Sequence, residues 1–255
     1  KTLSVTIPEG YTCRQIFALL EEQGICTVEE LETYSIEHTF DSYWFLENAE
    51  KGTAYTLEGY LFPDTYEFYI GSSAREVYIK LLAGFDASIT DEMKAQLDAL
   101  NETLAAKYRR NGLSQSYIDE HMLTMHDVII VASMIEKETA YSGESQNIAS
   151  VIYNRLTDPF DYPNLDIDAT IVYALGGKTD LTLEDLAYDS PYNTYLYEGL
   201  PPGPISNPGV YSIKAALDPN DTNYYFYALD TSGESFVHVF FRTYAEQKEF
   251  LDSLK

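Results

Sequence analysis

The chain has 255 residues, enough for one large domain, or for a medium-sized domain with a small module, around a real hydrophobic core. Its 16 basic residues against 41 acidic ones give a formal net charge of −25, which argues against nucleic acid as a partner and disfavours an anionic lipid surface. The two cysteines, Cys13 and Cys26, form no CxxC motif, so they predict neither a metal knuckle nor a thioredoxin-like site. They leave open a disulfide or two buried thiols.

The first part of the chain predicts a small module. Apolar and polar residues alternate over residues 3–12, which is typical of a strand. Thr12 is placed to cap a following helix, and Thr27 with Glu30 has the spacing of a capping box for a second, short helix. The pattern therefore predicts a strand, two helices and a return strand.

The middle of the chain is predicted to be mainly helical. The aromatic segment 56–71 holds a Pro-Asp turn and predicts strand–turn–strand. Helices are predicted over residues 74–85, 91–112, 125–139 and 146–156. Thr124 with Asp127 caps the third of these, and because apolar residues surround that helix on all sides, we expect it to be central and buried.

The last third predicts short strands joined by Pro/Gly loops, ending in a helix over 243–255. The strand and loop segments are 164–177, 190–209, 224–230 and 235–241. Residues 199–209 carry four prolines, and long irregular loops of this kind are usually functional or rigid. Together the predicted elements indicate an α+β fold with a mixed helical and short-strand main domain.

The helix predicted over 125–139 ends with two carboxylates, Glu136 and Glu138. At about 100° per residue, Glu136 continues an apolar stripe of small residues, whereas Glu138 lies on nearly the opposite face and is expected to be more easily wetted. Desolvation and the negative end of the helix dipole should raise the pKa of a carboxyl group placed here. Glu136 is then either a general acid or one half of an ion pair with a Lys or Arg, such as Arg155 on the next predicted helix.

Other reaction chemistries find little support. The sequence has no GxSxG, no Walker loop and no GxGxxG. The histidines show no zinc-ligand spacing, so we expect no metal and no cofactor; they are His38, His121, His126 and His238. His238 lies in a strand pattern and is predicted to pack there.

Six segments occur in a distinctive order between about residue 50 and the end of the chain. They are LEGYLFPDTYEF (57–68), VASMIEKETA (131–140), IASVIYNRL (148–156), LDIDATIVYAL (165–175), SPYNTYLYEGLPPGPISNPG (190–209) and HVFFRTYAE (238–246). Together they resemble the endolytic murein transglycosylases of the MltG/YceG-like family. The resemblance implies a LysM-like subdomain at residues 1–50 and a YceG-like catalytic domain at 51–255.

The family resemblance also implies a reaction and a catalytic residue. A lytic transglycosylase cleaves the β-1,4 bond between N-acetylmuramic acid and N-acetylglucosamine within a peptidoglycan glycan strand, and leaves a 1,6-anhydromuramyl end. One glutamate serves as acid and then as base, and the first Glu of the E-K-E-T motif, Glu136, takes this role by resemblance. Two positions depart from the family pattern, Asp166 where Gln is frequent and Gln247 where His is frequent.

Several polar residues are candidates for binding the sugar substrate. They are Asp168, Thr170, Tyr192, Asn193 and Tyr195, with Glu58 as a weaker candidate. The alternative for the PYNTY stretch is an Asx-type turn with tyrosine packing.

The resemblance further implies a parent protein with one N-terminal membrane helix, which would place this region on the extracytoplasmic side, facing peptidoglycan and possible synthase partners.

Two other functions stay open. One is a non-catalytic peptidoglycan-binding scaffold that recruits a cell-wall synthase. The other is a muramidase that uses Glu136 with Asp168 or Glu138 as a carboxylate pair. An aminodeoxychorismate lyase is discounted, because the chain has few lysines and no phosphate-cradling loop.

Overall fold

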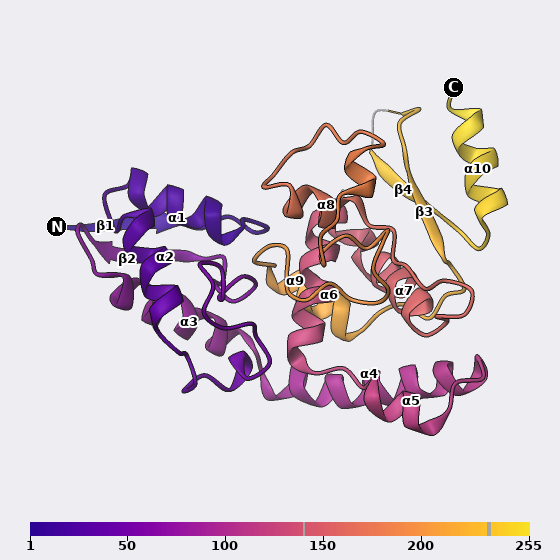
Figure 1. Cartoon of the computed structure of the whole chain (residues 1–255), viewed down its shortest axis with the longest axis horizontal. Coiled ribbons are helices and arrows are strands. Elements are labelled where there is room, and N and C mark those ends of the chain that lie inside the picture. Colours follow the sequence, from indigo (N-terminus) through magenta and orange to yellow (C-terminus); the bar gives the residue numbers. More distant parts are fainter. Residues whose placement is uncertain (140, 234–235) are drawn as a thin grey trace.

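The computed structural model describes residues 1–139, 141–233 and 236–255, and its elements fall into two lobes (Figure 1). The small lobe, residues 1–88, lies at the left of Figure 1 in indigo and violet, and the large lobe, residues 91–255, occupies the centre and right. Buried apolar residues of both lobes belong to one continuous hydrophobic cluster, so the lobes share a core.

The small lobe is a two-stranded sheet covered by helices. Its elements are β1 (Thr2–Thr6), α1 (Cys13–Glu22), α2 (Val28–Glu37), the 3-10 turn η1 (Trp44–Leu46), β2 (Thr65–Tyr69) and α3 (Ala74–Ser88). Thr12 caps α1, and Thr27 with Glu30 forms the capping box of α2, so both predicted helix starts are confirmed. Cys13 and Cys26 are buried free thiols, which settles the choice between a disulfide and two thiols.

The return strand of the small lobe lies later in the chain than the sequence pattern indicates. Strand β1 pairs antiparallel with β2, from Thr2 opposite Tyr69 to Thr6 opposite Thr65. A boundary at residue 50 therefore cuts between the two strands of this sheet. The division into units 1–50 and 51–255 stays a prediction, as does the likeness of the first unit to LysM.

Residues 56–64 form turns instead of the predicted first strand of 56–71, and only β2 is extended. Gly59 has φ +94, and a Cβ there would come within 2.6 Å of the Pro204 side chain. The backbone N–H groups of Gly59 and Leu61 donate to the side-chain oxygen of Asn207, at 3.0 and 2.8 Å. Because a distant side chain satisfies these donors, the segment needs no neighbouring strand.

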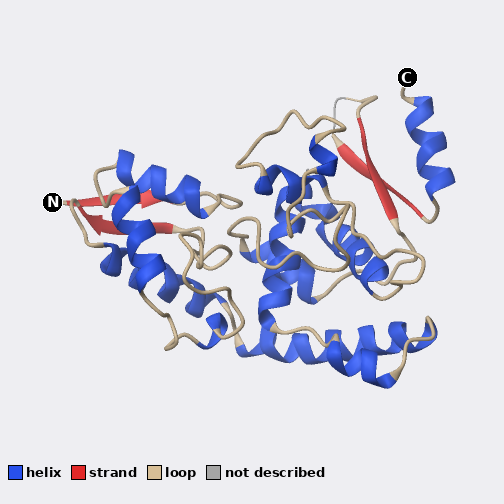
Figure 2. Ribbon diagram, in the orientation of Figure 1, coloured by secondary structure: helices blue, strands red, loops and turns tan. Residues whose placement is uncertain are grey.

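The large lobe is mainly helical, with a second small sheet at its far end. Its elements are α4 (Asp91–Arg110), α5 (Gln115–Glu120), α6 (Met125–Glu138), the 3-10 turn η2 (Ser142–Glu144), α7 (Ser145–Leu156), α8 (Asp168–Ala174), the 3-10 turn η3 (Asp185–Ala187), α9 (Val210–Leu217), β3 (Phe226–Asp230), β4 (Val237–Phe241) and α10 (Tyr244–Ser253). Strands β3 and β4 pair antiparallel, and Figure 2 shows the two sheets at opposite ends of a helical body. The fold is therefore α+β.

Helix α6 runs through the centre of the large lobe and packs against α7, α8 and α9 (Figure 1). Its residues from Met125 to Ile135 are buried, apart from Asp127 in the first turn, which confirms the expected central helix and its Thr124 cap. The predicted strands β3 and β4 and the C-terminal helix are also confirmed. Within 164–177 the structure has helix α8 and no strand, because a short apolar run fits a buried helical turn as well as a strand.

Candidate active site

Glu136 lies in the last turn of α6, partly buried, with its carboxylate at the start of α9. Its Oε2 accepts hydrogen bonds from the Gly209 N–H at 3.0 Å and from the Ser212 hydroxyl at 2.7 Å. Both donors belong to the start of α9, where backbone N–H groups lack partners within the helix. Glu136 therefore acts as a side-chain cap for α9.

A turn of the small lobe covers Glu136. The N–H of Gly10 donates to the carbonyl oxygen of Asn207 at 2.9 Å, and a Cβ on Gly10 would lie only 3.2 Å from Cγ of Glu136. Next to it, burial and the charge of Glu136 raise the pKa of Glu9. The two lobes thus meet directly over Glu136.

Arg155 does not pair with Glu136, so the ion pair considered from the sequence is wrong. The Arg155 guanidinium binds the Asp166 carboxylate at 2.7 Å and donates to three backbone carbonyls, of Asn164, Leu165 and Tyr225. Asp166 has φ 55, the one positive φ outside glycine among the described residues. The family departure at this position therefore supplies the partner of a buried arginine.

Glu138, two residues after Glu136, has a raised pKa and partners from two other elements. Its carboxyl group accepts from the Tyr227 hydroxyl at 2.9 Å and from the backbone N–H of Ala169 in α8. Burial raises the pKa of Glu138, and the charge of Asp168 raises it further, although both donors oppose the shift. The expectation that Glu138 is the more easily wetted acid is therefore wrong, because Tyr227 of β3 and the start of α8 cover it.

Two predicted substrate-binding residues gather beside Glu138. The Tyr195 hydroxyl donates to Asp168 Oδ1 at 2.7 Å, and the pKa of Tyr195 is raised mainly by burial and then by this bond and the nearby acids. Gln247, the second family departure, donates to the carbonyl oxygen of Tyr227 at 2.7 Å and so helps to hold the tyrosine that binds Glu138.

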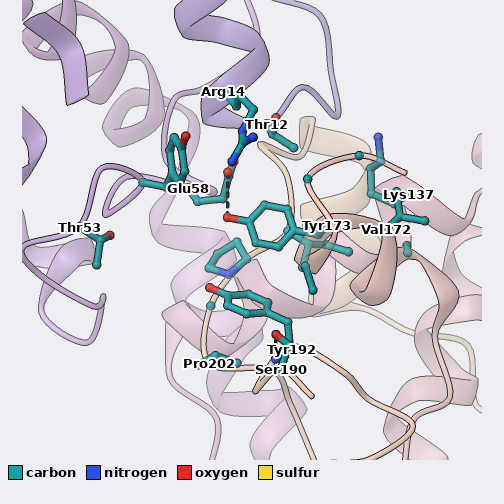
Figure 3. Close-up of a pocket in the computed structure, with 18 of the residues that line it drawn as sticks. Thr12, Arg14, Thr53, Glu58, Lys137, Val172, Tyr173, Ser190, Tyr192 and Pro202 are labelled. Atoms are coloured by element: carbon teal, nitrogen blue, oxygen red, sulfur yellow. Dashed lines mark hydrogen bonds between the residues drawn. The ribbon is translucent and has the colours of Figure 1, made fainter. Parts of the chain in front are cut away.

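A cavity of about 490 Å³ lies between the lobes, and we call it the inter-lobe pocket (Figure 3). Its lining includes Thr12, Arg14, Gln15, Glu50, Tyr55, Glu58, His126, Lys137, Ala169, Val172, Tyr173, Ser190, Tyr192, Pro202 and Pro204. Ala169 and Lys137 connect it to Glu138, because Ala169 donates to that carboxyl group and Lys137 precedes it in α6. The volume is within the range of ligand-binding pockets.

Glu58 is buried at the wall of the inter-lobe pocket and joins elements of both lobes. Its carboxyl oxygens accept from the N–H of Cys13 at 2.9 Å and from the Asn207 amide at 3.0 Å. They also accept from the Tyr173 hydroxyl at 3.1 Å, the bond drawn in Figure 3. Burial nevertheless raises the pKa of Glu58 to about 8. Glu58 is therefore largely uncharged at neutral pH.

The raised pKa of Glu58 predicts a pH-dependent stability. The folded chain binds this proton more tightly than the unfolded chain, whose value is 4.5, so the contribution is fully present below pH 4.5 and is lost as pH rises through about 8. Each pH unit in this window should lower the free energy of unfolding by roughly 1.4 kcal/mol at most. Urea unfolding at about pH 5 and pH 8 should show this loss in the wild type and a much smaller one in Glu58→Gln. Equal pH dependence in both proteins would contradict the assignment.

The remaining predicted site residues differ in their surroundings. Tyr192 lines the inter-lobe pocket, together with Glu58. Asn193 is fully buried, and its side chain bonds the carbonyls of Leu186 and Tyr188 and the N–H of Tyr195, as in the Asx-type turn. Thr170 is likewise buried, and its hydroxyl donates to the carbonyl of Ile167. These contacts support structural roles for Asn193 and Thr170, while Tyr192 is open to a ligand.

The sequence reasoning did not single out Tyr173, Asn207 or Tyr227, although each holds a carboxyl group of this region. Asn207 stands in the four-proline loop, so the unusual length of that loop was the available signal. His238 packs in β4 as expected, and its Nδ1 lies 2.8 Å from Glu144.

Within residues 1–139, 141–233 and 236–255, no three acidic, histidine or cysteine side chains are arranged to hold a metal ion. None of the helices in these ranges has the length and apolar character needed to cross a membrane.

Comparisons with known proteins agree on one family. The YceG-like family matches residues 1–252. A protein named endolytic murein transglycosylase from Bacillus subtilis (strain 168) is 32% identical over 257 residues, covering 96% of this chain and 63% of that protein. A protein of the same name from Streptococcus pneumoniae (strain ATCC BAA-255 / R6) is also 32% identical, over 253 residues, covering 91% of this chain and 41% of that protein. This chain thus spans less than two thirds of either relative.

A solved structure gives the same result for the fold. The crystal structure of a yceG-like protein from Listeria monocytogenes superposes with a TM-score of 0.73 at 31% sequence identity, covering 97% of this chain and 75% of that one. Sequence and structure therefore agree over nearly the whole chain, and the chain belongs to the YceG-like family.

Proposed function

We propose that this chain is the catalytic region of a lytic transglycosylase that cleaves the β-1,4 bond between N-acetylmuramic acid and N-acetylglucosamine inside peptidoglycan glycan strands. The names of the relatives support the activity and the substrate. The observation that carries the chemistry is a buried carboxyl group with a raised pKa, Glu138, beside Asp168 and next to the inter-lobe pocket. A raised pKa suits a general acid, because the carboxyl group then holds its proton at a higher pH than a free glutamate does.

We assign the acid/base role to Glu138 and keep Glu136 as the alternative. The family resemblance places the role on Glu136, but Oε2 of that carboxylate is already engaged by Gly209 and Ser212 at the start of α9. Glu138 has the raised pKa and the predicted sugar-binding neighbours Asp168 and Tyr195. The environment therefore favours Glu138.

The reaction needs one carboxyl group in two steps. Protonated Glu138 donates its proton to the glycosidic oxygen, the bond from that oxygen to C1 of the muramyl sugar breaks, and positive charge develops on the sugar ring. The carboxylate of Asp168, which acts on the pKa of Glu138, is placed to offset this positive charge. The Glu138 carboxylate then accepts the proton of the muramyl C6 hydroxyl, whose oxygen bonds to C1. The products are a 1,6-anhydromuramyl end and a free hydroxyl on the glucosamine, without added water.

A two-carboxylate muramidase is the second candidate, and the proximity of Asp168 to Glu138 favours it specifically. In that reaction water ends on C1 and the new end is a reducing end. Mass spectrometry of purified, uncrosslinked glycan strands digested by this chain separates the two. We expect anhydromuramyl ends. Reducing ends would identify a hydrolase, and intact strands would support the non-catalytic scaffold.

The cellular setting is also a proposal. We propose that the full-length protein is anchored in the cell membrane by an N-terminal helix, with this region on the extracytoplasmic side, and that it works beside a peptidoglycan synthase. The family resemblance supports this setting, because the peptidoglycan substrate lies outside the membrane. Protease accessibility of the full-length protein in intact spheroplasts tests the orientation, and we expect cleavage of this region without lysis.

A further inference from the structure

The inter-lobe pocket is unusual in its charge for so acidic a chain. The sequence has 16 basic residues against 41 acidic ones, yet Arg14 and Lys137 both line this pocket. Within the part of the chain that the structure describes, neither of them forms an ion pair. Both side chains are exposed to solvent, so a ligand in the pocket can reach them, and an excess of positive charge along a cleft attracts anions.

The acidic residues of the pocket wall do not cancel these cations. The lining contains Glu50 and Glu58, and Glu58 is largely uncharged because burial raises its pKa to about 8. His126 also lines the pocket, and burial lowers its pKa, so it adds no charge. The wall therefore carries two positive charges against the one negative charge of Glu50. Glu136 and Glu138 flank Lys137 in α6, so acidic side chains lie closer to Lys137 than to Arg14. Arg14 is therefore the cation more available to an anionic ligand.

Neutral groups hold both cationic side chains in place. The Arg14 guanidinium lies 5.4 Å from the centroid of the Tyr55 ring, and its Nη1 approaches Gly176 just after α8. Lys137 Nζ donates to the carbonyl oxygen of Gly10 at 3.3 Å. Figure 3 shows Arg14 entering the cavity from above and Lys137 standing at its right-hand edge. An arginine held by an aromatic face keeps most of its N–H donors free, in the fork geometry that fits a carboxylate.

The chemistry of the pocket fits one part of a glycan strand. Tyr55, Tyr173 and Tyr192 offer apolar faces beside the cations. In a strand whose stems are in place the sugars carry no charge, because the lactyl carboxyl group of the muramyl sugar is bound to the stem. The stem itself combines small apolar side chains with free carboxylates. Because Lys137 and Ala169 connect the pocket to Glu138, a stem attached near the cleaved bond would reach it.

We infer that the inter-lobe pocket binds a carboxylate of the peptide stem, with Arg14 as its main partner and Lys137 as the second. This inference rests on the proposed function, since it names which part of that substrate the pocket recognises. Arg14 is then a specificity-determining residue that makes the enzyme favour strands whose stems are intact.

The first test compares two substrates. Glycan strands with intact stems and the same strands with their stem carboxylates amidated are digested by the wild type, by Arg14→Gln and by Arg75→Gln, an exposed arginine of α3 outside the pocket lining. One charged hydrogen bond is worth about a tenfold ratio in kcat/KM. We expect the wild type and Arg75→Gln to prefer intact stems by about tenfold, and Arg14→Gln to show a ratio near one. A wild-type ratio near one, or an unchanged ratio in Arg14→Gln, overturns the inference.

A second test does not depend on cleavage. Titration calorimetry measures binding of the free stem pentapeptide, and of the same peptide with its carboxylates amidated, to each of the three proteins. We expect binding of the free peptide to the wild type, and at least tenfold weaker binding after amidation or in Arg14→Gln. If strands stay intact but the peptide binds in this way, the proposed function fails and the pocket assignment stands. If strands are cleaved but amidation leaves binding unchanged, the pocket assignment fails alone.

Discussion

Replacement of Glu138 by glutamine should lower the rate of glycan-strand cleavage by about a thousandfold, while the protein stays folded. Positioned acid–base catalysis contributes roughly 10²- to 10⁴-fold, and here one carboxyl group supplies both the acid and the base step. Glutamine keeps the shape and can still accept from Tyr227 and Ala169, but it cannot transfer a proton. The measurement is the initial rate of release of new strand ends by the purified variant.

The matched control is Glu136→Gln, two residues away in the same helix. Its amide oxygen can still accept from Gly209 and Ser212, so we expect a folded protein with activity within about tenfold of the wild type. The reverse result, an inactive Glu136→Gln and an active Glu138→Gln, would return the acid/base role to Glu136. Thermal unfolding of both variants shows whether any loss of activity comes from loss of structure.

Replacement of Asn207 by alanine should be the most destabilising single change in the region between the lobes. This fully buried side chain accepts from the N–H groups of Gly59 and Leu61, and donates to the carbonyl of Tyr11 and to Glu58. Alanine would leave these buried groups without partners, and each such group costs about 1–3 kcal/mol. We expect a loss of about 4 kcal/mol or more, and a fall in Tm of roughly 10 °C for a chain of this length.

An exposed asparagine provides the comparison for this measurement. Asn220 donates one surface hydrogen bond to Asn147 at 2.8 Å, so Asn220→Ala should change the free energy of unfolding by no more than about 0.5 kcal/mol. Urea unfolding of both variants gives the two values directly. A loss below about 1 kcal/mol for Asn207→Ala would mean that water replaces its bonds and that the lobes are held together by other contacts.

The features that depend on neighbouring residues could be predicted from the amino-acid order alone. Thr12, Thr27 and Thr124 cap helices because each cap and its partner lie three residues apart, within reach of one turn. The apolar surround of α6 marked it as central, since a helix that is apolar on all sides has to be buried. The order of the six family segments, which needs no geometry, was enough to indicate the YceG-like family.

Features that depend on residues far apart in the chain became visible only in the three-dimensional packing. Position in the last turn suggested that Glu138 is wetted, but Tyr227, from a strand almost ninety positions later, covers it. Residues 56–64 were predicted to be extended, but two of their N–H groups donate to the Asn207 side chain and the segment forms turns. Arg155 was a candidate partner of Glu136, but it pairs with Asp166. Burial sets the pKa of a carboxyl group and the partners of a backbone donor, and burial is made by packing between distant segments, which helix and strand periodicity does not encode.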